Sequence, residues 1–439
     1  MEGDAIGTGL VDKDPNKDDY EAEHSESDVP PDGGYGWVIA MGACFIHLIC
    51  LGLPTSFGVY SNYYIRETVF PNLTNASVSL ISSLMTMFMP LGGPFAGWLT
   101  SRFGARRVCF AGSTLVGLSL VAASFSTEIW HLWLAQGALV GLCTSFATQP
   151  CVAVLPQWFL HKRGVALGIA LSGTGAGGLA LASLSDLMLG KLGFRWSLRI
   201  TGIFGGLICM CSALAIRERV PRDPKVVIRV MPDFSVFSSR QFILLWLAIF
   251  FASFSYFAPN IYLPSYATSH FLSSSGAVLL AILNGVSGPA RVSAGLISDK
   301  LAGPINTLLV LQTVVTVAYF AIWLPAGGSL PMLFVFSVLY GSSVGALIVL
   351  SPVVLARQFG AANMAPRIAM LFLSMTPGYI IGPIVSGHLL DASATVATDG
   401  TKVSDFTGVL IFSGAFYAAS TICVAWLRTE SGGWKWRKM

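Results

Sequence analysis

Twelve apolar runs constrain the fold of this chain more than any other feature of its sequence. Each run is long enough to cross about 30 Å of hydrocarbon as a helix that rises 1.5 Å per residue. They lie near residues 37–60, 78–100, 108–126, 130–155, 164–188, 195–216, 241–265, 276–297, 305–325, 331–356, 367–390 and 408–427. Only 11% of the residues are charged, whereas soluble domains carry about a quarter. We therefore expect an all-α membrane protein with twelve transmembrane helices.

A basic segment divides the twelve runs into six and six. The residues before the first run are acidic and too poor in apolar side chains to fold, so we expect them to be disordered. The expected order is an acidic tail, a six-helix bundle, a linker, a second six-helix bundle and a short tail. These parts cover residues 1–36, 37–216, 217–240, 241–427 and 428–439.

The positions of the basic residues predict how the chain is oriented in the bilayer. If both tails are cytoplasmic, 20 of the 26 Lys and Arg residues lie on the inner side and five on the outer side. Because cytoplasmic loops retain positive charge, we expect a multi-pass protein of the plasma membrane with both termini in the cytoplasm. Asn72 and Asn75 each begin an Asn-x-Ser/Thr sequence in the first outer loop, which makes them candidate glycosylation sites.

Two internal echoes indicate that the halves are repeats of each other. The segment "GWLTSRFGARR" (97–107) follows the second run, and "GLISDKLAGP" (295–304) follows the eighth. In the fifth run Gly177 precedes Asp186 by nine residues, and in the eleventh Gly382 precedes Asp391 by nine. Parallel six-helix repeats are typical of one large class of secondary transporters.

These segments resemble the inner-loop motif of the major facilitator superfamily. The stretch 32–37, "DGGYGW", and the stretch 158–178, "WFLHKRGVALGIALSGTGAGG", are similar to two motifs of its monocarboxylate transporter family, in a form typical of fungal members. The resemblance covers nearly the whole chain and implies a fold of two six-helix bundles. It also implies that the inner loops help to gate the carrier, which makes Asp299 and Arg102 gating candidates. The family's acid is replaced by Ser101 in the first copy.

The residue types of the 32–37 stretch also have a structural interpretation that does not depend on the resemblance. Its glycines allow a sharp turn from the tail into the first helix, and Tyr35 and Trp37 suit the headgroup layer. Asp32 precedes this helix, where a carboxylate can cap the free N–H groups. The resemblance suggests a second role for Asp32, in coupling.

Arg291 is the leading candidate for a substrate-binding residue. It lies within the eighth run, where a charged side chain costs about 2.5–3.5 kcal/mol, and eight residues before Asp299, which is ~12 Å along a helix. In a polar cavity its guanidinium would attract an organic anion and could bind a carboxylate through two hydrogen bonds. The alternatives are an ion pair between helices and extension toward the inner interface.

Several uncharged polar residues are weaker candidates for substrate binding. Tyr256, Asn260 and Tyr262 lie in the seventh run beside Pro259 and Pro264, where a proline-broken helix can line a cavity. Asn284 lies in the eighth run. All four serve equally well as hydrogen-bonding residues between helices. His47, in the first run, could titrate near neutral pH or simply pack.

Two departures from the resembled family put its lactate–proton mechanism in doubt. The family's proton-coupled animal members have a lysine where this chain has Thr55, and an acid where it has Ser287. The resemblance therefore extends to the fold and the general class, while proton-coupled symport is left open.

We interpret the chain as a secondary transporter that moves a small organic anion, such as a monocarboxylate, across a bilayer by alternating access. One alternative is a facilitator or exporter of a neutral or larger metabolite, such as a vitamin or secondary product. Another is a nutrient sensor built on a carrier fold. We expect no enzyme, no cofactor, no metal and no nucleic-acid partner, because the sequence has no HExxH, G-x-S-x-G, P-loop or metal-spaced Cys/His pattern.

Overall fold

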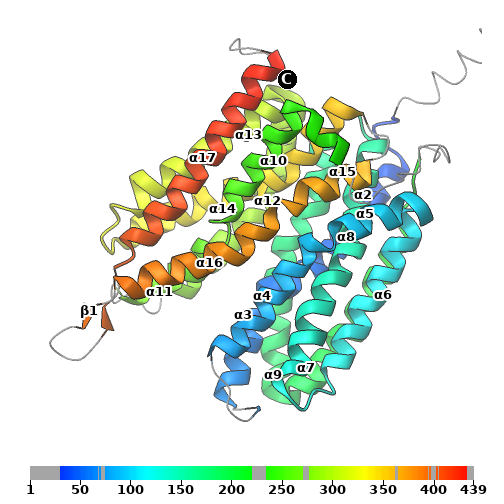
Figure 1. The fold of residues 1–439 in the computed structure, drawn as a ribbon. Helices are drawn as coiled ribbons and strands as arrows, with labels where there is room; N and C mark the ends of the chain where they lie inside the picture. Colours follow the sequence, from blue (N-terminus) through cyan, green and yellow to red (C-terminus); the bar gives the residue numbers. More distant parts are fainter. Residues whose placement is uncertain are drawn as a thin grey trace, which may run out of the picture.

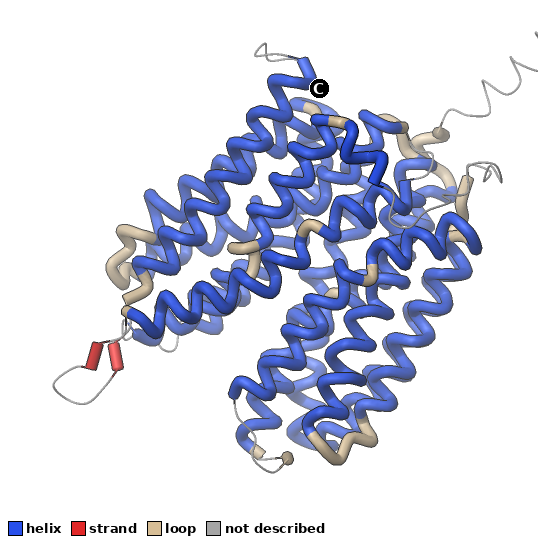
Figure 2. The backbone as a smooth tube through the Cα atoms, viewed as in Figure 1, coloured by secondary structure: helices blue, strands red, loops and turns tan. Residues whose placement is uncertain are grey.

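A computed structural model describes residues 30–67, 69–70, 75–219, 234–269, 276–360, 364–393, 395–396, 402–403 and 405–432. The acidic tail before Pro30, the candidate Asn72 and parts of the expected linker and C-terminal tail lie outside the described residues. The described chain is helical apart from its loops and one short antiparallel ribbon, β1 (Thr395–Val396) with β2 (Lys402–Val403) (Figures 1 and 2).

The described residues of the first half contain eight α-helices. They are α2 (Tyr35–Cys50), α3 (Gly52–Arg66), α4 (Asn75–Leu91), α5 (Gly93–Phe103), α6 (Ala105–Ala123), α7 (Ile129–Leu132), α8 (Val140–Trp158) and α9 (Arg163–Ala215). A π-helical turn, η1 (Trp133–Leu139), joins α7 to α8. Asn75 is the first residue of α4.

The second half follows a short 3-10 turn, η3 (Phe234–Ser238). Its helices are α10 (Arg240–Ser253), α11 (Ala258–Ser269), α12 (Gly276–Ile297), α13 (Pro304–Val317), α14 (Leu330–Phe359), α15 (Met364–Leu373), α16 (Met375–Ala392) and α17 (Thr407–Gly432). Two further π-helical turns, η4 (Ser298–Ala302) and η5 (Ala318–Trp323), extend α12 and α13.

The predicted number of spans is confirmed. Ten helical segments in the described part of the chain are long and apolar enough to cross a membrane, and the pair Ser77–Leu91 and Gly93–Phe103, bent by 44°, forms one more. The 53-residue helix α9 is interrupted at Gly193, whose φ of 75° and ψ of 171° are not helical. Because α9 therefore contains two spans, the described residues contain twelve.

The glycines of the internal echoes make equivalent contacts in the two halves. A Cβ at Gly177 in α9 would clash with the carbonyl oxygen of Leu48 in α2. A Cβ at Gly382 in α16 would clash with the carbonyl oxygen of Phe254, which follows α10. The fifth span of each half thus packs directly on the backbone of that half's first span, which is a contact only glycine permits.

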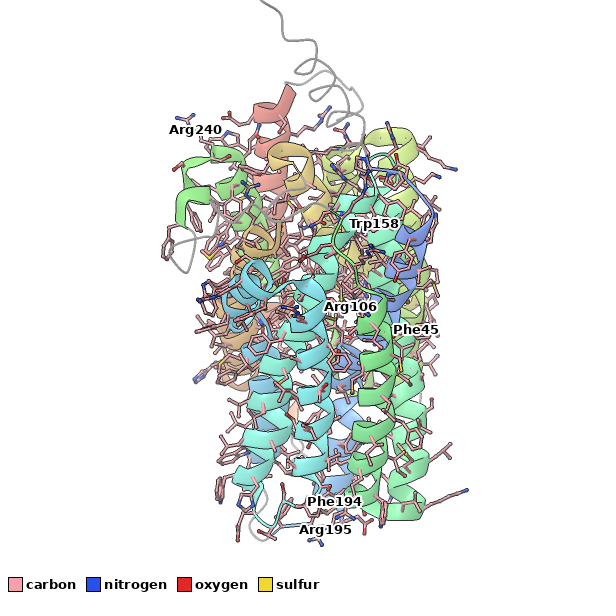
Figure 3. All side chains as sticks on the ribbon, turned by 90° about the vertical axis from the view of Figure 1, so that its right-hand side faces the viewer. Phe45, Arg106, Trp158, Phe194, Arg195 and Arg240 are labelled. Atoms are coloured by element: carbon pink, nitrogen blue, oxygen red, sulfur yellow. The ribbon has the colours of Figure 1, made fainter. Side chains whose placement is uncertain are left out.

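Both described ends of the chain lie at the same end of the molecule, as an even number of spans requires (Figure 1). From this end, which we call the tail end, the two groups of helices diverge toward α11 in the second half and α3 in the first. Figure 3 shows Trp158 and Arg240 near the tail end and Phe194 and Arg195 at the opposite end.

The start of the first helix differs from our prediction in one respect. Asp32 does not cap α2, whose N-cap is Gly34 at φ 58° with no side-chain bond. Instead, the Asp32 carboxylate accepts N–H bonds from Leu160, His161 and Lys162, at 2.7, 2.8 and 3.3 Å. The predicted cap is wrong because the chain's turn at Asp32 and Gly34, both at positive φ, directs the carboxylate toward the loop before α9.

Candidate functional site

In the described part of the chain four spans are broken partway along their length, and each break lies close to a proline. The breaks lie at Leu51, Gly92, Phe254–Phe257 and Ser374, and the prolines that follow them are Pro54, Pro94, Pro259 and Pro377. Proline has no N–H group and its ring collides with the preceding turn, so the helix cannot continue through it unchanged. Broken helices are tolerated at this depth where they line a cavity.

The break in the seventh span is held by two tyrosines of the second half. The carbonyl oxygen of Tyr256 accepts a bond from Tyr340 Oη at 2.8 Å, and that of Ser255 accepts one from Tyr319 Oη at 3.4 Å. Both tyrosine rings are fully buried. The Tyr256 carbonyl is thus satisfied inside the protein, as the membrane interior requires, while the Ser255 carbonyl also accepts the N–H of Ala258 at 3.2 Å.

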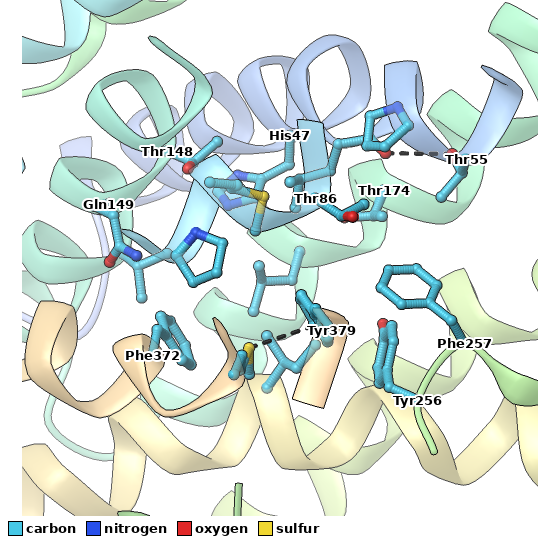
Figure 4. A pocket seen from close by; sticks show the side chains of 18 of the residues that line it. His47, Thr55, Thr86, Thr148, Gln149, Thr174, Tyr256, Phe257, Phe372 and Tyr379 are labelled. Carbon is cyan, nitrogen blue, oxygen red and sulfur yellow. Dashed lines mark hydrogen bonds between the residues drawn. The ribbon is translucent and has the colours of Figure 1, made fainter. Parts of the chain in front are cut away.

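A cavity of about 860 Å³, counting the space at its open side, lies between the two halves at these breaks (Figure 4). The first half contributes the polar residues of the lining, which we call the polar wall and which are set among Leu51, Pro54, Met89, Pro90, Val152 and Leu171. The polar wall consists of His47, Thr55, Thr86, Thr148, Gln149 and Thr174. The second half contributes an apolar wall of Tyr256, Phe257, Phe372, Met375 and Tyr379, together with Arg291. No acidic side chain of the described residues lines the cavity.

Arg291 is buried in the cavity wall, with 5% of the residue exposed. Its Nη1 donates a hydrogen bond to the carbonyl oxygen of Leu171 in α9, at 2.7 Å. Its Nε has no hydrogen-bond partner among the described residues. Gly345 in α14 makes room for the side chain, since a Cβ there would lie 2.5 Å from Nε. The guanidinium therefore bridges the two halves, and no carboxylate of the described residues forms an ion pair with it.

His47 lines the same cavity and is almost completely buried. Its Nδ1 lies 2.7 Å from the carbonyl oxygen of Ala43. Because a carbonyl only accepts, Nδ1 must carry the hydrogen, and the other ring nitrogen, Nε2, is an acceptor in the neutral imidazole.

The other predicted substrate-binding residues divide between the cavity and the helix contacts. Tyr256 lines the cavity, whereas Asn260, Tyr262 and Asn284 do not. Asn284 Nδ2 donates to Asn260 Oδ1 at 3.5 Å, and Tyr262 Oη donates to the carbonyl oxygen of Pro383 at 3.2 Å. For these three residues the geometry matches the alternative interpretation, in which they join α11 to α12 and α16.

The gating candidates lie at the tail end, away from the cavity. Asp299 accepts hydrogen bonds from the N–H groups of Gly164 and Val165, at 3.0 and 2.9 Å, and so joins the end of α12 to the start of α9. Arg102 is exposed, and its guanidinium lies 5.6 Å from the ring centroid of Trp98 in its own helix. Ser101 likewise donates to the carbonyl oxygen of Trp98, at 2.8 Å.

Asp32 is held at the tail end by its own half of the molecule. Its Oδ2 lies 2.7 Å from Nδ1 of His161, in addition to the three N–H bonds described above. Burial alone would raise the pKa of Asp32, but the bonds from His161 and from the three N–H groups hold the pKa below its ordinary value. These contacts position the loop before α9 and place Asp32 outside the cavity.

Most residues of the polar wall were not among the predicted substrate-binding residues. Thr148 and Gln149 come directly before Pro150 within an otherwise apolar run, and this polar pair beside a proline was a signal that could have been used. Phe372 lies shortly before Pro377 and Tyr379 shortly after it. Both signals resemble the one that led to Tyr256 beside Pro259.

Comparison with known proteins gives consistent results. A family model described as Major Facilitator Superfamily matches residues 43–329. The chain is 33% identical over 415 residues to "Uncharacterized transporter ESBP6" of Saccharomyces cerevisiae, an alignment that covers 92% of this chain and 60% of the yeast protein. It is 31% identical over 402 residues to "Aspyridones efflux protein apdF" of Emericella nidulans, covering 90% and 81% of the two chains. With "MFS transporter asaE" of Aspergillus flavus the identity is 28% over 408 residues, covering 92% and 90%.

Proposed function

Because the chain belongs to the Major Facilitator Superfamily and is a multi-pass membrane transporter, we propose that it carries an organic anion by alternating access. In this scheme, the two halves rock about the cavity between them and expose it to one side of the membrane at a time. The observation that carries the proposal is Arg291, a buried cation in that cavity with no acidic neighbour among the described lining residues.

The surroundings of Arg291 leave its charge available to a ligand. Leu171 provides one neutral acceptor for Nη1, while Nε has no partner among the described residues. A buried charge without a counter-ion is unfavourable. An anionic group in the cavity would offset this cost, and the planar guanidinium can hold a carboxylate with paired hydrogen bonds.

We further propose that the chain is a member of the monocarboxylate-transporter type. The 32–37 and 158–178 motifs support this kinship, whereas Thr55 and Ser287 depart from the family's proton-coupled pattern. Thr55 lines the cavity, so a neutral side chain occupies the position at which the family's proton-coupled members have a lysine. Proton coupling, where it occurs, needs a titratable group in the cavity, and His47 is our candidate for that role.

The excess of Lys and Arg on one side supports a cytoplasmic tail end, and we propose the plasma membrane as the location. Trp158 and Arg240 lie near the tail end in Figure 3. Labelling of single cysteines placed after Gly432 and at the exposed position of Arg195, in a variant without the eight native cysteines, would test this orientation. Equal accessibility from the two sides of sealed vesicles would contradict it.

A second candidate function is export of a larger metabolite. The cavity has an apolar, aromatic wall that a three-carbon acid would leave largely without contacts. One relative's printed name describes it as an efflux protein for aspyridones. This candidate uses the same cavity and differs from the first in the size of the ligand.

Counterflow in proteoliposomes tests the proposed function. Purified protein would be assayed with a panel of carboxylates and neutral analogues, with and without a pH gradient. We expect Arg291→Ala to abolish counterflow of every anion, and Arg291→Lys to restore part of it. Arg195→Ala, at the exposed far end, is the matched control. Unchanged anion counterflow in Arg291→Ala would refute the proposal.

A further inference from the structure

The two walls of the cavity belong to different halves of the protein and differ in chemistry. Figure 4 shows His47, Thr55, Thr86, Thr148, Gln149 and Thr174 on one side and Tyr256, Phe257, Phe372 and Tyr379 on the other. A ligand that fills the cavity therefore touches hydroxyl, amide and imidazole groups on one face and aromatic rings on the other.

The polar wall offers mostly hydrogen-bond acceptors. Thr55, Thr86 and Thr148 donate their only hydroxyl hydrogen to backbone carbonyls of their own helices, at 2.9, 3.0 and 2.8 Å. A hydroxyl has one donor and two acceptor sites, so these oxygens can only accept from a ligand. Neutral His47 presents an acceptor nitrogen, whereas the Gln149 amide nitrogen and the Thr174 hydroxyl, which has no partner among the described residues, can also donate. O–H or N–H groups on a ligand would therefore match the three threonines and His47.

The apolar wall is formed by rings that pack against one another. The ring centroids of Phe257 and Tyr379 are 4.8 Å apart, those of Tyr256 and Phe257 5.1 Å, and those of Tyr256 and Tyr379 5.8 Å. Tyr379 Oη contacts Met375 Sδ at 3.3 Å, so its hydroxyl is occupied within the wall. Such a surface favours flat, polarisable groups, because aromatic rings gain stability from stacked and edge-to-face contacts beyond the burial of their area.

From this division we infer the class of ligand, building on the proposed function. We propose that the carried anion is a flat aromatic or conjugated acid that also bears hydroxyl or N–H groups. Its planar part contacts the aromatic wall of the second half, its donors contact the polar wall of the first half, and its anionic oxygens bind Arg291. A short aliphatic acid satisfies only the last of these three contacts.

A matched set of four probes tests the assignment on the purified full-length protein. The probes are 6-hydroxy-2-naphthoate, 2-naphthoate, decahydro-2-naphthoate and the neutral 6-hydroxy-2-naphthamide, with acetate as the small acid. Binding would be measured by calorimetry and transport by counterflow. We expect affinity to fall at least fivefold when the hydroxyl is removed and about tenfold more when the ring is saturated. Acetate should bind weakest of the acids.

Two variants test whether the hydroxyl preference arises from the polar wall and the ring preference from the aromatic wall. In Gln149→Leu, the advantage of the hydroxylated probe over 2-naphthoate should shrink to less than twofold. In Tyr379→Leu, the advantage of 2-naphthoate over its saturated analogue should shrink in the same way. Each variant should leave the other preference intact, and a wild-type elution profile and thermal unfolding midpoint would show that it folds.

The outcomes separate this inference from the proposed function. If 2-naphthoate and decahydro-2-naphthoate bind equally, if neither variant changes its preference, or if acetate matches the aromatic acids, the ligand class is wrong while an anion carrier stands. If the neutral amide binds as tightly as the acid, the role of Arg291 and the proposed function fail, whereas the hydroxyl and ring preferences still test the two walls.

Discussion

At the tail end the two halves meet at the α12–α9 contact and at the α5–α15 contact, and each contact involves one copy of the repeated segment. Among the described residues, a charged side chain forms hydrogen bonds between the halves at the α12–α9 contact only. In the second copy, Gly295 packs against Gly164, and Asp299 four residues later accepts the N–H groups of Gly164 and Val165. In the first copy, Gly97 packs against Pro366, and Ser101 four residues later bonds only within its own helix among the described contacts.

This difference teaches that the repeat preserves backbone packing more strictly than it preserves polar contacts. Both glycines allow the helices of opposite halves to touch. The residues that face the acid's position are not equivalent, however, because Pro366 has no N–H group to donate. We infer that opening the tail end breaks charge-assisted hydrogen bonds at the α12–α9 contact and, at the α5–α15 contact, the packing of Gly97 against Pro366 and Ala369.

Substitution of the two packing glycines should give the largest effects and the clearest contrast. A Cβ at Gly295 would collide with the backbone of Gly164, whereas a Cβ at Gly97 would lie 2.9 Å from Pro366 Cα and 3.0 Å from Ala369 Cβ. Overpacking of this kind costs about 1–3 kcal/mol. We expect Gly295→Ala to lower the thermal unfolding midpoint and the counterflow rate more than Gly97→Ala. Equal effects would show that the two contacts are interchangeable.

Removing the charge of the acid should have the next largest effect. Hydrogen bonds to a charged group contribute about 1.5–3 kcal/mol, so Asp299→Asn should shift the halves toward the state that is open at the tail end by roughly tenfold. Hydrogen–deuterium exchange of the peptide that contains Gly164 and Val165 would measure the shift. Ser101→Ala is the matched control, and exchange that is the same in both variants would contradict the comparison.

Adding an acid to the first copy should change the opening of the tail end by a smaller factor. It should do so only when a backbone N–H donor is supplied as well. Ser101→Asp alone should change exchange and counterflow by less than about twofold, since Pro366 offers no N–H. The pair Ser101→Asp with Pro366→Ala should slow opening of the tail end several-fold. A full effect from Ser101→Asp alone would show that other donors reach this position.

The smallest effect should come from Asp32, which binds the loop before α9 from within the same half. Its pKa lies below the ordinary value in the folded protein, so its stabilising contribution is present near pH 7 and is lost as the pH falls through the folded pKa. Asp32→Asn should lower the unfolding midpoint at pH 7 without changing exchange at Val165. The difference from wild type should narrow below about pH 4. A change in the tail-end equilibrium instead would give Asp32 a gating role.

The sequence predicted what depends on composition and on local chemistry. Twelve spans follow from apolar length, and Arg291 was identified because a charge in a membrane helix is costly unless it has a function. Asp299 was identified from the motif that contains it. Gly177 and Gly382 were identified as equivalent positions of the repeat. None of these predictions required knowledge of which helices are neighbours.

Predictions that depend on the choice of partner were less reliable. Asp32 was expected to cap the helix next to it, but its carboxylate binds a loop some 130 residues away in the chain. Asn260 and Asn284 were candidates for ligand binding, yet they bond to each other. Gln149 and Thr174 were missed because uncharged polar residues are common in membrane helices, and only the tertiary arrangement distinguishes those that face the cavity.

The braced break in the seventh span has a consequence for how this carrier adapts to its cargo. Tyr340 and Tyr319 hold the carbonyls of Tyr256 and Ser255, so the elbow that presents the aromatic rings is stiff. A rigid turn cannot adjust the positions of these rings to ligands of different shape. We therefore expect adaptation to ligands of different shape to depend more on side chains outside this turn, such as Gln149 on the opposite face and Met375.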